Sequence, residues 1–281
     1  MEDVSIPPLN DPWMVAAFEG WNDAGDAATS LVDHLVDEWD AQVLAELDPD
    51  DYYDFQLTRP TLERDDEGTA MIVWPTPTLY LARPAGFERD VLLLRAPEPS
   101  FRWRAFCSTV VGIARLAGVT ELVAVGALLT DAPHSRPVPV TGSSSDPTLE
   151  TRLNLRPSRY SGPVGINAVL TETATREGIP SLSMWAAVPH YVAEPPCPKA
   201  TLALLRALED AVACPLPYGM LEELSEAWQR GADEAAAEDP EIAEYVSELE
   251  QAQDEDDLPE ASGESIAREF ERYLRRRGAD G

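Results

Sequence analysis

Two of the three histidines in this chain occupy near-identical settings. His134 and His190 each follow a proline at the end of an apolar run of strand length, ELVAVGALLTDAP in one case and SLSMWAAVP in the other. If both runs are buried strands of one sheet, both imidazoles emerge at strand ends, where open α/β sheets place their ligand crevices. An imidazole there can act as a general acid or base near neutral pH. A lone histidine is more often structural, so the pair predicts a shared polar crevice and leaves its chemistry open.

Two further polar side chains accompany these histidines. Arg136 lies two residues after His134, and Tyr191 directly follows His190. A guanidinium at this position could hold an anion, so we include Arg136 and Tyr191 among the candidate crevice residues. Asp131 could complete a metal site with the histidines, but nothing in the spacing fixes its geometry, and we predict no metal.

Two loops elsewhere in the chain carry the remaining candidates. GWNDAG, with Asn22 and Asp23, links the first expected strand to a helix, where backbone N–H groups suit anions. RAPEPSFRWRAF places Glu98 just after a strand and Arg102 at the start of a helix. The structural alternatives are that Asn22 and Asp23 cap the helix and that Glu98 and Arg102 belong to an ion-pair cluster. GWNDAG lacks the glycine spacing of a dinucleotide or P-loop fingerprint, and we predict no cofactor.

Other catalytic motifs are missing from the sequence. Three cysteines, an odd number, have spacings that fit no zinc pattern: Cys107, Cys197 and Cys214. There is no G-x-S-x-G elbow, and the serines at 143–145 are expected to lie in a flexible loop. A Ser-His-Asp triad is therefore disfavoured.

The elements that must position these residues alternate between strands and helices. Strands are expected at 13–18, 42–47, 91–94, 121–129 and 179–187, and helices at 26–39, 103–117, 165–176 and 199–212. Residues 69–74 and 78–82 resemble a hairpin around Pro75 and Pro77. Residues 48–68 are acidic and poorly patterned, and 131–162 form a long excursion. Strands that are apolar on both faces predict a mostly parallel sheet covered on each side.

The composition changes near residues 215–217. From 219 to 260 there are sixteen acidic residues and one basic residue, yet Leu221, Leu224 and Trp228 have helical spacing. We therefore divide the chain into an α/β domain at 1–217 and an acidic helical extension at 218–281, with Ser265 capping a last helix. We expect the apolar stripe to pack against the protein's own core or a neighbouring subunit; the alternative is a binding surface for another protein.

The bulk composition excludes some classes of protein. Lys and Arg number 21 against 51 Asp and Glu, so the chain of 281 residues carries a net charge of −30. Such a field repels nucleic acids and anionic membranes. No apolar run approaches the length of a membrane span. Unpaired thiols and the absence of a signal peptide predict a cytoplasmic location.

Five segments together resemble the PAC2 family, named for proteasome assembly chaperone 2. They are GWNDAG, EPSFRW, GALLTDAPHSRPV, YSGPVGI and SMWAAVPHYVAEPPCPKA, in this order between about Trp13 and Pro217. The extension that ends in IAREFERYLRRR resembles the tail of the actinobacterial branch. The resemblance implies a three-layer α/β/α sandwich like that of nucleoside phosphorylases and related hydrolases, and self-association as a trimer.

The resemblance also bears on function. Some archaeal and eukaryotic relatives assist proteasome assembly, and many bind through a C-terminal hydrophobic-Tyr-any tripeptide. This sequence ends Ala279-Asp280-Gly281, so docking by that route is not expected. We favour a non-enzymatic assembly or scaffold protein with a protein partner. The alternative is a small-molecule-binding protein or a hydrolase- or phosphorylase-like enzyme, in which His134 or His190 moves a proton.

Overall fold

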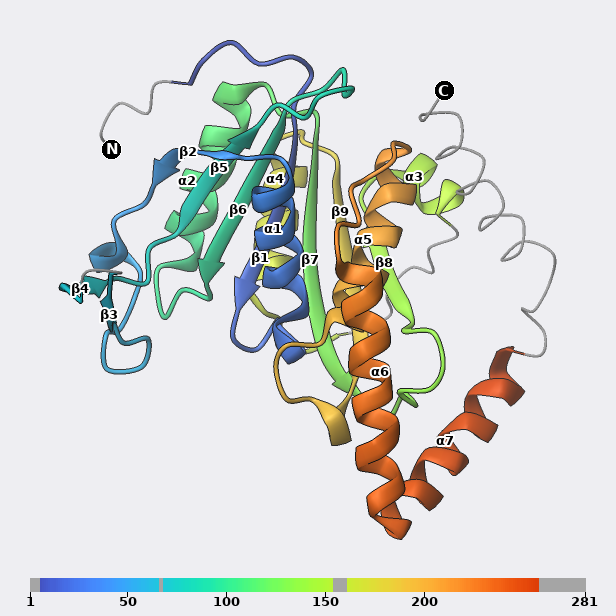
Figure 1. Ribbon diagram of the computed structural model, residues 1–281. Coiled ribbons are helices and arrows are strands. Elements are labelled where there is room, and N and C mark those ends of the chain that lie inside the picture. The colour runs from blue at the N-terminus through green and yellow to red at the C-terminus, as the bar shows by residue number, and fades with distance from the viewer. Residues whose placement is uncertain (1–5, 66–67, 154–160, 258–281) are drawn as a thin grey trace. The chain divides into compact units, whose positions relative to one another are not determined.

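A seven-stranded sheet forms the centre of the fold (Figure 1). The computed structural model describes residues 6–65, 68–153 and 161–257. The strand order is β2-β5-β6-β1-β7-β9-β8. The strands are β1 (Trp13–Glu19), β2 (Gln42–Glu46), β5 (Thr78–Ala82), β6 (Val91–Pro97), β7 (Glu121–Thr130), β8 (Val140–Ser144) and β9 (Ser181–Pro189). β1 pairs in parallel with both β6 and β7, whereas β5 pairs antiparallel with β2 and β6.

The described part of the chain forms seven α-helices, all but the third close to the positions that hydrophobic periodicity predicts. They are α1 (Ala27–Glu38), α2 (Trp103–Ala117), α3 (Pro147–Arg152), α4 (Ile166–Arg176), α5 (Pro198–Val212), α6 (Leu221–Glu238) and α7 (Pro240–Asp257). Gly118 ends α2 with a φ of 77°, in the left-handed region that favours glycine after a helix. Pro198 begins α5, where the missing N–H of proline has no helical partner to lose.

The described residues fall into two compact units. The first contains residues 6–23, 32–65, 68–126, 142–153 and 161–184, and the second contains 24–31, 127–141 and 185–257. The strands β7, β8 and β9 each contribute residues to both units. The boundary expected at residue 217 stays a prediction.

In the first unit, both faces of the sheet are covered by helices. Met14, Ala16 and Phe18 of β1 belong to a core cluster with the inner faces of α2 and α4, and Phe18 meets Phe106 edge to face at 5.9 Å. The alternate residues of β1 are equally buried, and Trp13 packs against Trp39 just after α1. Figure 1 shows α1 in front of the sheet and α2 and α4 behind it. The predicted α/β fold with a mostly parallel central sheet is confirmed.

The hairpin predicted from residues 69–74 and 78–82 is wrong. β4 (Ala70–Val73) instead pairs with β3 (Thr61–Arg64), inside a segment that shows no clear pattern, and β5 joins the central sheet. The turn that closes β3 and β4 contains Gly68, with a φ of 81°, and Asp65 N donates to Thr69 O. Prolines 75 and 77 have no N–H to continue a ladder, so they separate β4 from β5 instead of joining them.

The long excursion predicted at 131–162 contains regular structure. β8 lies at the edge of the sheet, and α3 follows it after Asp146, whose Oδ1 accepts a hydrogen bond from Thr148 N at 2.7 Å. Serines 143–145 were expected in a flexible loop, but 143 and 144 belong to β8 and Ser145 is hydrogen-bonded to Ser181. That expectation is wrong.

In the second unit, α6 packs against α5 and α7 packs against α6. The buried residues of α6 are Leu221, Ser225, Ala232 and Ala236, and the small side chains of the last three allow close approach of the helices. Leu224, which the sequence placed on the packed stripe, is 48% exposed, because its position falls outside this face. The cap at Ser265 lies outside the described residues.

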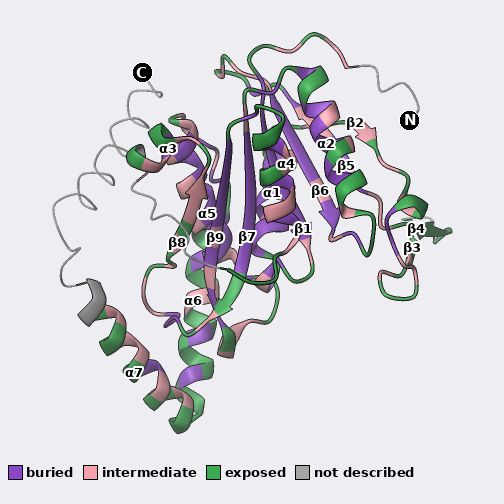
Figure 2. Cartoon of the chain, turned by 180° about the vertical axis from the view of Figure 1, so that it is seen from behind, coloured by how far each residue is buried: buried purple, intermediate pink, exposed green. Residues whose placement is uncertain are grey.

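The central strands are buried and the separate hairpin is exposed. Most residues of β1, β6 and β7 are buried, whereas those of β3 and β4 are exposed (Figure 2). Within the part of the chain that the structure describes, every helix is too short or too polar to cross a membrane.

Candidate functional site

The two Pro-His segments meet at one edge of the sheet. β7 and β9 are neighbours, and His190 Nδ1 lies 3.4 Å from Thr130 O at the end of β7. Tyr191 stands between the histidines, with its ring centroid 5.6 Å from that of His134 and 5.7 Å from that of His190. The strand ends therefore bring His134, His190 and Tyr191 into one cluster, which we call the histidine cluster.

His134 is held from both sides of its ring. It is 2% exposed, its backbone N donates to Tyr191 Oη at 2.7 Å, and its Nδ1 lies 2.8 Å from the same oxygen. Burial raises the pKa of Tyr191, so its hydroxyl keeps the proton that it can donate to Nδ1. The other ring nitrogen, Nε2, lies 3.1 Å from Asp233 Oδ1. Both nitrogens that could transfer a proton are occupied by side chains of this chain.

Lys199 completes this arrangement, and it is the single lysine of the sequence. Its Nζ donates to His134 O and to Gln229 Oε1, which ties α5 and α6 to the Pro-His loop. Burial lowers the pKa of Lys199, and nearby Asp233 partly opposes that shift. Sequence reasoning missed Lys199 and Asp233, although a unique lysine two residues after Cys197 was a visible signal.

His190 is the accessible member of the cluster, with a half-exposed side chain. Its Nδ1 lies 3.3 Å from Asp131 Oδ1, and Tyr245 of α7 donates to the same oxygen at 3.1 Å. The ring of Tyr245 lies 5.7 Å from that of His190. The contacts among His190, Asp131 and Tyr245 attach α7 to the end of β9. A role of His190 in proton transfer stays a prediction.

Arg136 binds acidic residues of α7. Its Nε and Nη2 contact the two oxygens of Asp254 at 2.9 and 2.8 Å, and its Nη1 lies 3.3 Å from Glu250 Oε1. The hydrogen bond from Arg136 lowers the pKa of Asp254. The guanidinium of Arg136, which was expected to hold an anion, is thus paired with two carboxylates of this chain.

Asn22 and Glu98 meet in the first unit, in what we call the Asn22–Glu98 clamp. Asn22 Nδ2 donates to Glu98 Oε1 at 2.8 Å, and Ile166 N at the start of α4 donates to the same oxygen at 2.9 Å. A Cβ at Gly165 would lie 2.1 Å from Asn22 Oδ1, so only glycine fits there. The segments GWNDAG, EPSFRW and YSGPVGI therefore converge, and Glu98 acts as a cap for α4.

The other two candidates lie near this clamp in the sequence. Asp23 is buried, and its backbone N donates to Gly20 O at 3.1 Å. Arg102 is exposed, pairs with Asp51 at 2.5 Å, and stands over the ring of Tyr52. Arg102 thus takes part in an ion pair of its own segment, and its role in ligand binding stays a prediction.

Two aromatic side chains beside the clamp face solvent. Trp21, which precedes Asn22, is 87% exposed, and Phe101, three residues after Glu98, is 43% exposed. Their loops leave adjacent parallel strands, β1 and β6, at the same edge of the sheet. The clamp pairs Asn22, which is buried, with the half-buried Glu98, while the aromatic side chains face solvent. Sequence reasoning concentrated on Asn22 and Asp23 and missed Trp21.

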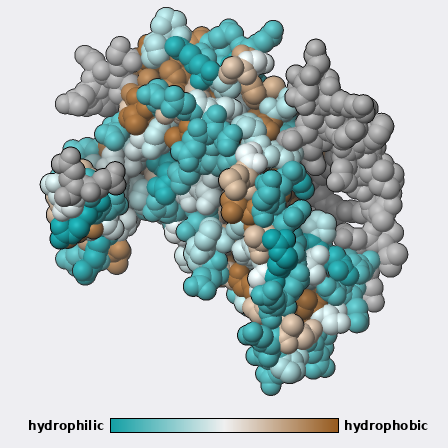
Figure 3. Space-filling model, viewed as in Figure 1, coloured by the Kyte–Doolittle hydropathy of each residue, from teal (hydrophilic) through white to brown (hydrophobic). Residues whose placement is uncertain are grey.

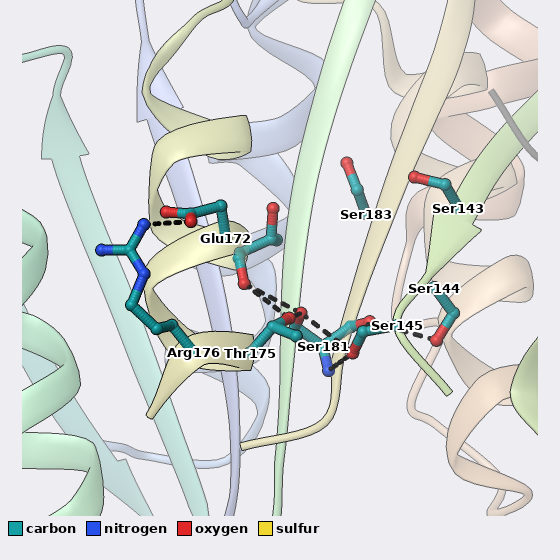
Figure 4. A pocket seen from close by; sticks show the side chains of 9 residues that line it. Ser143, Ser144, Ser145, Glu172, Thr175, Arg176, Ser181 and Ser183 are labelled. Carbon is teal, nitrogen blue, oxygen red and sulfur yellow. Dashed lines mark hydrogen bonds and ion pairs between the residues drawn. The ribbon is translucent and has the colours of Figure 1, made fainter. Parts of the chain in front are cut away.

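A cavity of about 410 Å³ lies between α4, β9 and the end of β8 (Figure 4). Its lining side chains carry hydroxyl groups, apart from Glu172 and Arg176, which pair with each other. Several hydroxyls bind other lining groups. Ser181 Oγ lies 2.7 Å from Thr175 Oγ1, and Ser181 N donates to Ser145 Oγ at 2.9 Å. These contacts join α4 and β8 to β9.

Cysteine and metal chemistry find little support among the described residues. Burial raises the pKa of Cys107 to about 12 and also raises that of Cys197, so both thiols stay protonated at neutral pH. Cys197 N donates to Gly25 O at 2.8 Å, which joins the GWNDAG loop to the start of α5. Within the described ranges, no three His, Cys, Asp or Glu side chains are grouped so as to hold a metal ion.

Several solved structures resemble this chain along most of its length. A PAC2 family protein from Streptomyces avermitilis is 53% identical, with a TM-score of 0.78, and the match covers 84% of this chain and all of that one. A Mycobacterium tuberculosis structure, described as a proteasome-assembly chaperone homologue, is 45% identical, with a TM-score of 0.76 and coverage of 83% and 99%. A Corynebacterium glutamicum protein of unknown function is 29% identical, with a TM-score of 0.80 and coverage of 90% and 94%. Among curated proteins, the comparison finds no match. The model of the PAC2 family matches residues 17–236, and the chain therefore belongs to the PAC2 family.

Proposed function

We propose that this chain is a protein-binding assembly factor of the proteasome-assembly chaperone kind, which works as a cytoplasmic homo-oligomer, a trimer by family resemblance. The observation that carries the proposal is Trp21, an almost fully exposed tryptophan on a loop that the Asn22–Glu98 clamp fixes in place. Tryptophan is enriched among the residues that dominate binding energy in protein interfaces. The 45% identical relative described as a proteasome-assembly chaperone homologue supports the choice of partner class.

The polar groups at the strand ends favour this proposal over catalysis. His134 uses both ring nitrogens within the chain, Arg136 is paired with α7, and Glu98 caps α4. A general acid or base must reach the proton that it transfers. Hydrogen bonds and ion pairs within the chain hold these loops rigid. A rigid binding surface loses less conformational entropy when a partner associates with it.

The test is a binding titration of the purified chain against the proteasome α- and β-subunits of the same organism. Replacing Trp21 by alanine removes a central contact, which costs about 2 kcal/mol or roughly 30-fold in affinity at a hot spot. Leu116→Ala is the matched control, because Leu116 is 78% exposed on α2, away from the clamp. Absence of binding by the unaltered chain, or equal binding by the Trp21→Ala variant, would contradict the proposal.

A further inference from the structure

The cavity between α4, β9 and the end of β8 is lined mainly by hydroxyl groups. Its described lining residues all lie between 143 and 183, so the cavity belongs to the first unit alone. They are Ser143, Ser144, Ser145, Thr171, Glu172, Thr175, Arg176, Ser181 and Ser183, and none of them is aliphatic or aromatic. The volume of about 410 Å³ falls within the roughly 300–1,000 Å³ of small-molecule pockets.

Hydrogen bonds within the chain hold the wall of this cavity in place. Ser181 is 3% exposed, and its Oγ lies 2.7 Å from Thr175 Oγ1 and 3.1 Å from Thr171 O. Its backbone N donates to Ser145 Oγ at 2.9 Å, and its backbone O accepts from Ser144 Oγ at 3.1 Å. These bonds connect α4, β8 and β9. The cavity therefore has its shape before a ligand enters, which lowers the entropy cost of binding.

Several polar groups of the lining keep hydrogen-bonding capacity for a ligand. Ser143 Oγ, on the β8 side, has no partner among the described residues (Figure 4). Thr171 Oγ1 donates to backbone oxygens of its own helix and keeps its lone pairs as acceptors. Glu172 and Arg176 pair with each other on the α4 side, which leaves a second carboxylate oxygen and further guanidinium N–H groups. The cavity therefore offers both donors and acceptors.

The balance of these groups favours a neutral polar ligand. The charged lining residues, Glu172 and Arg176, are paired, so neither a phosphate nor an ammonium group meets a net opposite charge. The net charge of −30 further disfavours anions. An apolar ligand would displace water from the lining hydroxyls without replacing its hydrogen bonds. A compact molecule with several hydroxyls matches the lining, because each hydroxyl both donates and accepts.

We propose that this cavity binds a neutral polyhydroxylated molecule of monosaccharide size, held by the hydroxyls of Ser143 and Thr171 and by the Glu172–Arg176 pair. Because the described lining residues include no aromatic ring to stack on a sugar, binding depends on hydrogen bonds that each replace one to water. We expect a dissociation constant on the order of 1 mM. The site goes beyond the proposed partner binding and is independent of the Trp21 surface.

Ligand-observed NMR titration of the full chain with D-glucose and, separately, with myo-inositol tests the site. At least one probe should bind. Ser143→Val and Thr171→Val should each raise its dissociation constant roughly threefold to tenfold, because each removes one hydroxyl from the cavity. Thr173→Val is the matched control, since Thr173 Oγ1 donates to Val169 O in the same helix at 2.7 Å and does not line the cavity. Thermal melting should show similar stability for the Thr171→Val and Thr173→Val variants.

Inorganic phosphate is the third probe, and it should not bind. Absence of binding by both neutral probes, binding of phosphate in their place, or equal affinity of the Thr171→Val variant and the unaltered chain would overturn the proposal. A preference for D-glucose identifies a sugar and a preference for myo-inositol a cyclic polyol, and either supports it. The Trp21→Ala variant should bind the probe as the unaltered chain does, so failure of partner binding and failure of this site give different results.

Discussion

Polar side chains at the strand ends of this protein mainly bind distant parts of the same chain. His134 connects the end of β7 to α6 through Asp233, and Glu98 connects β6 to α4. The meeting of His134 with His190 could be predicted, because neighbouring parallel strands bring their carboxyl ends to one edge. Their partners could not, since Lys199 and Asp254 come from helices 65 and 118 residues away from the groups they bind. Those contacts depend on helix packing, which sequence spacing does not specify.

The clamp can be tested at Gly165. Gly165→Ala places a Cβ 2.1 Å from Asn22 Oδ1, so Asn22 must move and its bond to Glu98 is strained. We expect the free energy of unfolding to fall by about 2 kcal/mol in urea titration. Gly112→Ala in α2 is the matched control, because its Cβ meets no atom within 4 Å, and it should be neutral or stabilising. Equal stability of the two variants would show that the clamp is unimportant.

Cys107 predicts a dependence of stability on alkaline pH. Burial raises its pKa from the ordinary 9.0 to about 12, so the folded chain keeps a proton that the unfolded chain releases. The resulting stabilisation is complete below pH 9 and is lost as the pH rises towards 12, with a limiting slope of about 1.4 kcal/mol per pH unit. Urea titrations of the unaltered chain and Cys107→Ala across this range measure it. Parallel pH profiles for the two proteins would mean that the thiol is not buried as described.

Among the elements, long periodic segments were predicted and short mixed ones were not. The helices at 103–117 and 166–176 show their apolar face in the sequence. β3 reads TLER, with one strongly apolar residue in four, and both of its faces are exposed, so no alternation marks it. In α6, the sequence assigned Leu224 to the packed face, but the next residue, Ser225, is buried instead. Small residues such as Ser225 and Ala232 form this face, and hydrophobic periodicity does not mark them.

The attachment of α7 is an element-scale prediction. Arg136→Ala removes the bonds to Asp254 and Glu250, so amides in residues 240–257 should exchange hydrogen faster. Arg230→Ala, which removes only an exposed pair 3.9 Å from Glu226, should change little. Because Arg136 lowers the pKa of Asp254, the pair persists above the ordinary carboxyl pKa and is lost as pH falls through the lowered one. Unchanged exchange in the Arg136→Ala variant would argue against this attachment.

For the whole molecule, the distribution of charge and apolar groups limits the kinds of partner. Hydrophilic residues cover most of the face in Figure 3, and hydrophobic residues gather in small separate areas. With a net charge of −30, association with an acidic surface is disfavoured. The PAC2 match runs from 17 to 236, so it includes both the clamp and most of α6. Partner binding should therefore depend on the loops that carry Trp21 and Phe101. The negative charge of the chain should repel acidic proteins that compete for this surface.

Hydrogen exchange of the chain with and without purified proteasome α- and β-subunits tests the central claim most directly, because it locates the contact. We predict protection at residues 20–22 and 98–102, around Trp21 and Phe101, and its loss in the Trp21→Ala variant. Protection confined to the histidine cluster at residues 131–136 and 190–193, or no protection anywhere, would contradict the account.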